Sequence, residues 1–215
     1  MAVVEVPEAT VSRLPIYFRV LADLSDRREI SVSSERISEL AGVNAATVRK
    51  DFSYLGSYGT RGVGYEVAVL LSQIGTRLGM ARSWPVVIAG AGNLGQALAN
   101  YRGFSERGFP VLALIEVDES KVGSTVHGVP VCAVADLADI VAENEGCIGV
   151  VATPAPVAQA VVDRFVAAGI RSIMNFAPTV LTVPDDVHMR QVDLAVEMQV
   201  LSFHGQSRDP GRSPA

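Results

Sequence analysis

The feature that most constrains the fold is a glycine-rich turn placed directly after a short apolar run. Residues 86–95 read VVIAGAGNLG, which puts Gly90, Gly92 and Gly95 between an apolar segment and the helical run QALANY. The first glycine of such a pattern permits a tight turn, the second lets a pyrophosphate approach the backbone, and the third allows a helix to pack closely on a strand. The phosphates then face free N–H groups at the helix start. The pattern predicts a dinucleotide site at Gly90, Ala91, Gly92, Asn93, Leu94 and Gly95.

An acidic residue ends the next apolar run, VLALIE, at Glu116. A carboxylate at this strand end accepts hydrogen bonds from ribose hydroxyls and repels a 2′-phosphate, which favours NAD(H) over NADP(H). Lys121 lies near the same adenine-side strand end. Later apolar runs at 147–152 and 172–175 alternate with helical stretches near 136–143 and 157–168, so we expect a parallel sheet whose ligand edge collects the strand-end loops. The further expected ligand contacts are Thr153, Pro154, Asn175, Ala177 and Pro178.

The N-terminal region has a different pattern, with helical periodicity and one glycine-rich turn. An amphipathic helix is expected near 12–24, with Pro15 in its first turn or kinking it. Ser34 can cap a second helix that Gly42 ends, and Asn44 can cap a third that Gly56 ends. Two short helices joined by a turn with a glycine are typical of the helix-turn-helix motif.

The third helix has two distinct faces. Val48, Phe52 and Leu55 are spaced to face a core. Small and basic residues lie opposite, as a recognition helix in a major groove requires. The following segment, GSYGTRGVGY, resembles a two-stranded wing with Arg61 at its tip, although a solvated helix face and a surface loop remain the alternatives. The candidate DNA contacts are Ala46, Thr47, Arg49, Lys50, Ser53, Ser57, Tyr58 and Arg61.

The charge distribution agrees with this division. The net charge is −5, but residues 1–82 hold ten Lys and Arg against nine Asp and Glu, whereas residues 83–215 hold eight against fourteen. DNA affinity depends on local phosphate contacts, so the acidity of the second half does not exclude it. No apolar run reaches the roughly 18 residues of a membrane span, and the N-terminus lacks a signal-peptide pattern. We therefore expect a cytoplasmic protein with no membrane partner.

Metal and redox sites are not indicated. The three histidines have no ligand spacing, so no metal site is expected. Cys132 and Cys147 lie among apolar residues and are interpreted as small buried side chains, with a redox role left open.

Catalysis is not indicated either. A dehydrogenase needs a proton donor or acceptor near the nicotinamide, and Tyr101 and Asp193 are undistinguished candidates. No catalytic residue is assigned. Two alternatives remain: a small NAD-dependent oxidoreductase, and a regulator that binds another nucleotide such as CoA, against which Glu116 argues.

Several stretches occur together in a recognisable order: VPEATVSRLPIYFRVL, TVRKDFSYLGSYGTRGVGY, GAGNLGQALANYRGF and NFAPTVL. With them the chain, to about residue 205, resembles the Rex redox-sensing transcriptional repressors. The resemblance implies an α/β protein with a winged-helix DNA-binding domain at 1–82 and a Rossmann NAD(H)-binding domain at 83–192. It also implies a C-terminal helix at 193–204 that is swapped between the subunits of a homodimer. The segment after His204 is polar and rich in Gly, Ser and Pro, so a disordered tail is expected at 205–215.

The resemblance further implies that NADH releases the dimer from palindromic operators of respiratory and fermentative genes, while NAD+ occupies the same site and permits repression. It identifies Arg49, Lys50 and Arg61 as DNA contacts, and Arg19, Tyr101 and Asp193 as switch contacts between domains and subunits. The sequence departs from the family pattern on the adenine side of the expected nucleotide pocket. Residues 116–119 read EVDE, where the family commonly has Asp-x-Asp-Pro. The degree of NADH/NAD+ discrimination therefore need not match that of relatives.

Overall fold

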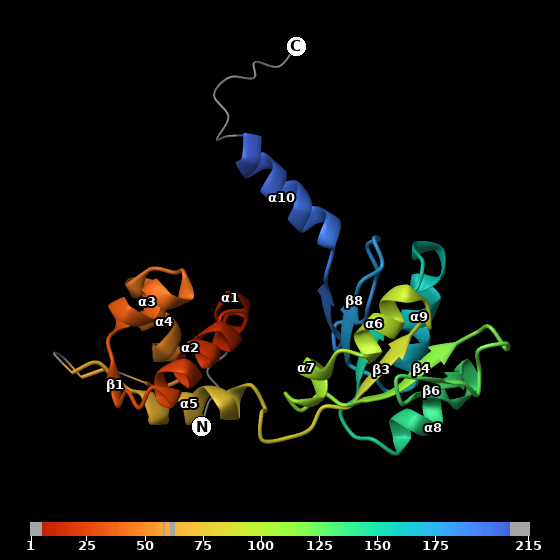
Figure 1. The fold of residues 1–215 in the computed structure, drawn as a ribbon, viewed down its shortest axis with the longest axis horizontal. Helices are drawn as coiled ribbons and strands as arrows, with labels where there is room; N and C mark the ends of the chain where they lie inside the picture. The colour runs from red at the N-terminus through yellow and green to blue at the C-terminus, as the bar shows by residue number, and fades with distance from the viewer. Residues whose placement is uncertain (1–5, 58, 61–62, 207–215) are drawn as a thin grey trace, which may run out of the picture. The chain divides into compact units, whose positions relative to one another are not determined.

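The structure is a computed structural model that describes residues 6–57, 59–60 and 63–206. The chain divides into two compact units, Met1–Arg82 and Ser83–Ala215, which are both drawn in Figure 1. Each unit has its own buried apolar cluster, so each is described by itself.

The first unit is a small helical domain with a two-stranded sheet. Its core centres on Phe52, whose ring meets the rings of Tyr17 and Tyr65 edge-on at centroid distances of 5.3 and 5.1 Å. The predicted helix near 12–24 is observed at 14–26, with Pro15 in its first turn, where a missing N–H costs no hydrogen bond. In chain order the elements are α1 (Glu8–Val11), α2 (Leu14–Asp26), β1 (Ser31–Val32), α3 (Ser34–Ala41), α4 (Ala45–Tyr54), β2 (Tyr65–Glu66) and α5 (Val67–Arg77).

Helices α3 and α4 form the predicted helix-turn-helix, with one correction to its capping. Ser33, not Ser34, caps α3, because the Ser33 hydroxyl accepts a hydrogen bond from the Arg36 amide at 3.1 Å. Gly42 ends α3 in the left-handed conformation at φ 68°, as predicted. Asn44 caps α4, also as predicted, and accepts the Thr47 amide at 2.8 Å. Ser34 lies inside α3 and is buried.

The wing region is partly described. Thr60 and Gly64 form an antiparallel bridge, and β2 pairs with β1 in antiparallel register. Sequence periodicity did not predict β1, which is only two residues long. Tyr58 and Arg61, two of the predicted DNA contacts, lie outside the described residues.

The second unit contains a seven-stranded sheet in the order β5-β6-β4-β3-β7-β8-β9. All neighbouring pairs are parallel except β5 with β6, which form a hairpin. Strands that follow β3 are first added on its β4 side and later on its β7 side. Ligands bind in parallel sheets at the point where the strand order switches in this way. The strands are β3 (Val86–Ala89), β4 (Val111–Glu116), β5 (Thr125–Val126), β6 (Val129–Ala133), β7 (Ile148–Val151), β8 (Ser172–Asn175) and β9 (His188–Gln191).

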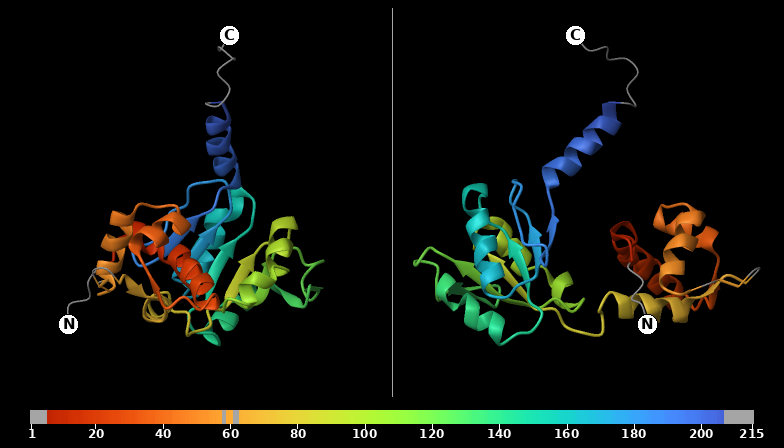
Figure 2. Two further views of the ribbon diagram at one scale, coloured as in Figure 1. Left: turned by 60° about the vertical axis from the view of Figure 1, so that its left-hand side comes forward. Right: turned by 180° about the vertical axis from the view of Figure 1, so that it is seen from behind.

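Helices cover both faces of this sheet, as can be followed in Figure 2. Alternate residues of β3 enter different apolar clusters, because side chains of a strand point to opposite faces in turn. Val87 and Ala89 join the cluster that includes α8 and α9, whereas Val86 and Ile88 join the cluster that includes α6. The helices of this unit are α6 (Asn93–Ala99), α7 (Arg102–Ser105), α8 (Leu137–Ala142), α9 (Ala155–Ala167) and α10 (Leu194–Gln206), and a short 3-10 turn, η1 (Val134–Asp136), precedes α8.

The C-terminal part of the unit differs from prediction in two respects. Strand β9 was not predicted, since HMRQ is polar and lies at the sheet edge. Helix α10 runs to Gln206, so two residues assigned to the tail are helical, and positions 207–215 lie outside the described residues. Figure 1 shows α10 extending beyond the sheet, and its side chains are exposed from Leu194 to Gly205.

Candidate nucleotide and nucleic-acid sites

The glycine loop joins β3 to α6 at the carboxyl edge of the sheet. Gly90 has φ 102°, and a Cβ there would stand 2.7 Å from the carbonyl oxygen of Ala152. A Cβ at Gly95 would collide with the carbonyl oxygen of Gly90, so both glycines are needed by the fold itself. At Gly92, by contrast, an added Cβ would meet no heavy atom within 4 Å. The open side of the loop is therefore at Gly92, where a pyrophosphate can approach.

Glu116 ends β4 beside this loop. Its Oε2 accepts the Ala91 amide at 2.9 Å, and its Oε1 accepts the Val117 amide at 2.8 Å. Burial alone would raise the pKa of Glu116, but these amides, that of Asp118 and the nearby Lys121 ammonium hold it below its ordinary value. Lys121 Nζ lies 3.8 Å from Glu116 Oε2. Glu116 is thus an ionised acceptor held against the glycine loop, suited to ribose hydroxyls.

A hollow of about 260 Å³ opens between this carboxylate and α9. Gly90, Glu116 and Thr153 form its sheet edge. The hydroxyl oxygen of Thr153 is buried and has no hydrogen-bond partner among the described residues. An unpaired buried hydroxyl is costly, so this hydroxyl is a candidate hydrogen-bonding group for a molecule in the hollow. The apolar walls, suited to an adenine ring, are Val134, Leu137, Val157, Val161 and Phe165.

The loop after β8 lies further along the same edge. Asn175 was predicted to contact the cofactor, but it is fully buried and its amide is used inside the protein. Its Oδ1 accepts the Ala177 amide at 2.8 Å, and its Nδ2 donates to Gln191 Oε1 at 2.6 Å. The side chain shapes the loop instead of facing the cleft. Ala177 is buried too, whereas Pro178 and Pro154 are exposed.

The nucleic-acid candidate is α4. Val48 and Phe52 are fully buried and Leu55 is nearly so, as the periodicity predicted. Ala46 and Lys50 are exposed on the other face, and Lys50 has an exposed, flexible amine for a phosphate or base. The recognition helix therefore has the predicted polarity.

The flanking candidates are partly engaged within the domain. Arg49 Nη1 lies 3.0 Å from Glu35 Oε1 and 2.9 Å from Ser34 Oγ, which ties α4 to α3. The Ser57 hydroxyl is buried and bonded to Gln73, so its side chain is not presented at the surface. Thr47 is bonded to its cap, and the Ser53 hydroxyl donates to the Lys50 carbonyl at 2.7 Å.

Sequence reasoning missed a buried carboxylate on the core side of α4. Asp51 is 1% exposed and accepts four hydrogen bonds. Thr10 donates at 2.7 Å, Tyr17 at 2.7 Å, and the Arg13 guanidinium in a forked pair at 2.6 and 2.8 Å. A charged residue three positions after Val48 and four before Leu55 was the available signal, because that spacing places it on the buried face.

This group, the Asp51 cluster (Thr10, Arg13, Tyr17 and Asp51), has strongly perturbed ionisation. Burial by itself would raise the pKa of Asp51, but hydrogen bonds from its three partners outweigh it and hold that pKa below its ordinary value. Burial and the bond to Asp51 raise the pKa of Tyr17. The hydrogen bond to Asp51 likewise raises the pKa of Arg13. The cluster anchors the recognition helix to α1 and α2.

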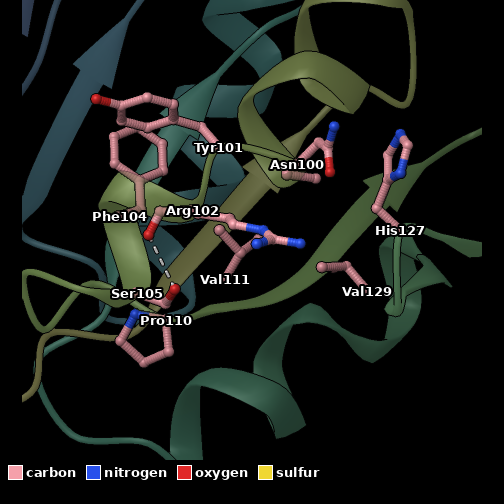
Figure 3. Close-up of a pocket in the computed structure, with 10 residues that line it drawn as sticks. Asn100, Tyr101, Arg102, Phe104, Ser105, Pro110, Val111, His127 and Val129 are labelled. Carbon is pink, nitrogen blue, oxygen red and sulfur yellow. Dashed lines mark hydrogen bonds between the residues drawn. The ribbon is translucent and has the colours of Figure 1, made fainter.

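Of the three predicted switch residues, one lies in the first unit and two lie in the second. Arg19 is exposed on α2 of the first unit. Tyr101 is 54% exposed in the second unit, stacks edge-on against Phe104 at 5.1 Å, and borders a hollow of about 400 Å³ together with Arg102 and His127 (Figure 3). Asp193 begins α10, and its Oδ1 accepts the amides of Ala195 and Val196 at 2.9 and 3.3 Å. The candidate switch contacts are thus one cation, one phenol and one carboxylate.

The two cysteines are both free thiols. Cys147 is buried and its Sγ donates to the Asn144 carbonyl at 3.1 Å, while Cys132 is half-buried. Burial raises the pKa of both thiols, which disfavours the reactive thiolate. Within the described ranges, no cluster of three or more His, Cys, Asp or Glu is arranged for a metal ion, and no helix is long and apolar enough to span a membrane.

Comparisons with known proteins agree with both sites. Residues 5–53 match the family model "Putative DNA-binding protein N-terminus", and residues 81–179 match "CoA binding domain". The redox-sensing transcriptional repressor Rex of Streptomyces avermitilis is 59% identical over 203 residues, covering 94% of this chain and 81% of that protein. Rex of Desulfitobacterium hafniense is 44% identical over 208 residues, covering 97% and 99%.

Solved structures extend the similarity to the fold. The structure of RSP in complex with β-NAD+ and operator DNA has a TM-score of 0.88 and 36% identity, covering 95% of this chain and 94% of that one. RSP in complex with β-NADH has a TM-score of 0.83 and 34% identity, covering 95% and 96%. Since relatives at these identities span nearly the whole sequence and share its two-unit architecture, the chain belongs to the Rex family of redox-sensing transcriptional repressors.

Proposed function

We propose that this protein is a transcriptional repressor that binds palindromic operator DNA and senses the NADH/NAD+ ratio, with NADH releasing it from operators of respiratory and fermentative genes. The observation that carries the ligand side is the buried Thr153 hydroxyl, which lacks a partner in a cleft also bounded by the Glu116 carboxylate. The same chain presents Lys50 on a helix-turn-helix. RSP, a similar repressor, was crystallised with NAD+ and operator DNA.

The ligand has a natural direction across the sheet. We place the adenosine in the 260 Å³ hollow, with its ribose hydroxyls on Glu116 and Lys121 nearby. The diphosphate then lies over the open side of Gly92 at the start of α6. The nicotinamide extends past Thr153 towards the loop after β8, since the strand order runs β4-β3-β7-β8. Asn93, Leu94, Pro154 and Pro178 border this path.

The exposed face of α4 is the proposed DNA-binding surface. Ala46 leaves room for a base edge, and Lys50 reaches phosphates or bases from the exposed face. Arg49 contributes a guanidinium that is still about half exposed despite its bond to Glu35. We assign Thr47, Ser53, Tyr58 and Arg61 as flanking contacts and leave out Ser57, whose hydroxyl is bonded to Gln73 inside the domain. A palindromic operator requires two such helices, hence a homodimer whose half-sites are about one DNA turn apart.

Helix α10 supplies the dimer contact in this proposal. A helix that is apolar on all sides is normally buried, yet every side chain of α10 from Leu194 to Gly205 is exposed. Six large apolar residues are between 47% and 67% exposed: Leu194, Val196, Met198, Val200, Leu201 and Phe203. We propose that the partner subunit covers them by exchange of α10. Sedimentation should then give a dimer, and Met198→Glu should give monomers.

A redox response requires that the ligand bind two conformations of the protein with different affinities. A ligand shifts the equilibrium between two conformations only through that difference. Reduced nicotinamide is neutral and oxidised nicotinamide is cationic. A closed, apolar nicotinamide pocket disfavours the unpaired cation, so NADH stabilises a closed dimer. Arg19, Tyr101 and Asp193 are the proposed contacts that hold it. The protein works in the cytoplasm in this proposal, where operators and the NADH pool are found.

The test uses a palindromic site selected from random DNA by the protein itself. Fluorescence anisotropy of the complex is followed while NADH, NAD+ and CoA are titrated separately. We expect release by NADH and not by NAD+. Equal release of DNA by NADH and NAD+, or release by neither, contradicts redox sensing. Release by CoA alone identifies a CoA-responsive regulator. Loss of NADH absorbance in the presence of carbonyl compounds identifies an oxidoreductase. Lys50→Ala should weaken DNA binding without changing NADH affinity.

A further inference from the structure

The inference concerns how occupancy of the nicotinamide end reaches α10, and it rests on the proposed function. Loop 176–181 follows β8 at the ligand edge, on the side of β3 away from Glu116. A dinucleotide whose adenosine lies beside Glu116 therefore brings its nicotinamide to this loop. The loop is therefore the segment of the second unit that the nicotinamide ring would meet in that placement.

A small hydrogen-bond network holds this loop from the neighbouring strand. Gln191, the last residue of β9, donates from Nε2 to the Ala177 carbonyl at 2.9 Å. Its Oε1 accepts from Asn175 Nδ2 at 2.6 Å. Asn175 Nδ2 also lies 3.3 Å from the carbonyl oxygens of Ala177 and Thr179. One carboxamide thus connects the loop backbone, the end of β8 and the end of β9.

The same strand end leads directly into α10. The Val192 amide donates to the Asn175 carbonyl at 2.8 Å, which completes the pairing of β8 with β9. Asp193 follows and caps α10 through its Oδ1. Figure 1 shows β8 on the side of the sheet from which the chain rises into α10. Only two residues separate Gln191 from the first residue of that helix.

A hollow of about 480 Å³ separates the loop from the helix. The loop borders it through Pro178, Thr179 and Val180, and α10 borders it through Val196 and Glu197. Gln191 lines the same hollow, and its side chain joins the Ala177 carbonyl in the loop to the strand end that leads into α10.

We propose that Gln191 is a positioning residue that couples the nicotinamide-side loop to the start of α10. When the cofactor displaces the loop, the Ala177 carbonyl moves, and the hydrogen bond from Gln191 transmits this movement to the end of β9. The change then reaches Asp193 and the first turn of α10. Gln191 does not touch the ligand in this proposal, so its loss should impair coupling more than ligand affinity.

The test compares Gln191→Met, which keeps the length of the side chain and removes both hydrogen bonds, with wild type in the full-length protein. Three quantities are measured: the Kd for NADH, the operator Kd without ligand, and the operator Kd at saturating NADH. The ratio of the two operator constants is the coupling factor, commonly about 5 to 150 in allosteric proteins. We expect both separate affinities within about threefold of wild type and a coupling factor lowered about tenfold.

The chain offers a matched control in Gln159. Its Nε2 donates to the Thr182 carbonyl at 3.0 Å, and its Oε1 accepts the Thr182 amide at 2.9 Å. Gln159→Met removes these two bonds to Thr182 and a third bond, to Asp163, all made from α9 and away from α10. It should leave the coupling factor unchanged. Gln191→Glu, which keeps the acceptor for Asn175 and loses the donor to Ala177, should give an intermediate factor.

Hydrogen exchange gives a readout that a purely structural role would not produce. In wild type, NADH should slow exchange at the amides of Ala177 and Thr179 and at amides 194–197, whereas in Gln191→Met it should slow only the first group. An unchanged coupling factor in Gln191→Met, an equal loss in Gln159→Met, or slowing of both groups in the variant overturns the inference while leaving the proposed function standing. No NADH release in wild type overturns both.

Discussion

Replacement of Asp51 tests whether the Asp51 cluster holds the recognition helix. Asp51→Ala removes a carboxylate that is 1% exposed and leaves Thr10, Tyr17 and Arg13 without their acceptor. Breaking a buried ion pair by removing one partner costs about 3–5 kcal/mol. Arg13 is 26% exposed, so water can partly replace its acceptor, and the lower end of that range is expected.

The expected loss can be measured on the full-length protein. A change of 3 kcal/mol in a unit of this size lowers its Tm by roughly 12–24 °C. Thermal unfolding followed by circular dichroism measures the change in Tm. Hydrogen exchange at the amides of α4 tests whether the destabilised unit is the N-terminal one. Asp51→Asn should cost less, since it keeps the shape and one acceptor oxygen. Operator affinity should fall with α4 protection, while NADH affinity stays unchanged.

The pH dependence follows from the sign of the pKa shift. The pKa of Asp51 is held below its ordinary value of 3.8, so its contribution is fully present above that value and is lost as pH falls through the folded-state pKa. The stability gap between wild type and Asp51→Asn should therefore be constant from pH 7 to about pH 5 and narrow in stronger acid. A gap below about 1 kcal/mol for Asp51→Ala at pH 7, or one that widens in acid, would refute the reasoning.

Four further substitutions test the nucleotide site. Gly95→Ala forces a Cβ into the Gly90 carbonyl and should destabilise the second unit by about 3 kcal/mol in urea unfolding; Gly92→Ala has space for its Cβ, so it should fold normally and lose NADH affinity in calorimetry. Glu116→Gln should weaken NADH and NAD+ binding equally, by about tenfold, because the adenosine end is common to both, and unequal losses would contradict the placement. Thr153→Val removes an unpaired buried hydroxyl, so it should raise the Tm of the free protein while lowering NADH affinity, and a lower Tm would argue against an unsatisfied group.

Local patterns in the sequence were sufficient where the physical cause is itself local. The strand–glycine loop–helix unit at Gly90–Gly95, the left-handed Gly42 and the Asn44 cap each depend on contacts within a few residues, and all were predicted correctly. The faces of α4 were also predictable, since helical periodicity alone assigns Phe52 to the core. The shift from Ser34 to Ser33 shows the limit, because two adjacent serines offer the same cap chemistry.

The rest was decided by tertiary structure. Asp51 meets its partners across 34 to 41 residues of sequence, and Asn175 meets Gln191 across 16, so no local pattern reports whether such a polar side chain is solvated, bound to a ligand or paired. The short strands β1 and β9 exist because a partner strand supplies their hydrogen bonds, not because of their own composition. The sequence by itself determined the glycine loop, the helix caps, the faces of α4 and the nucleotide chemistry that the loop suits, since backbone conformation and side-chain charge are local. Only the folded chain decided which buried polar groups are satisfied within the protein and which, like the Thr153 hydroxyl, have no partner among the described residues, because that depends on neighbours brought together from distant parts of the chain.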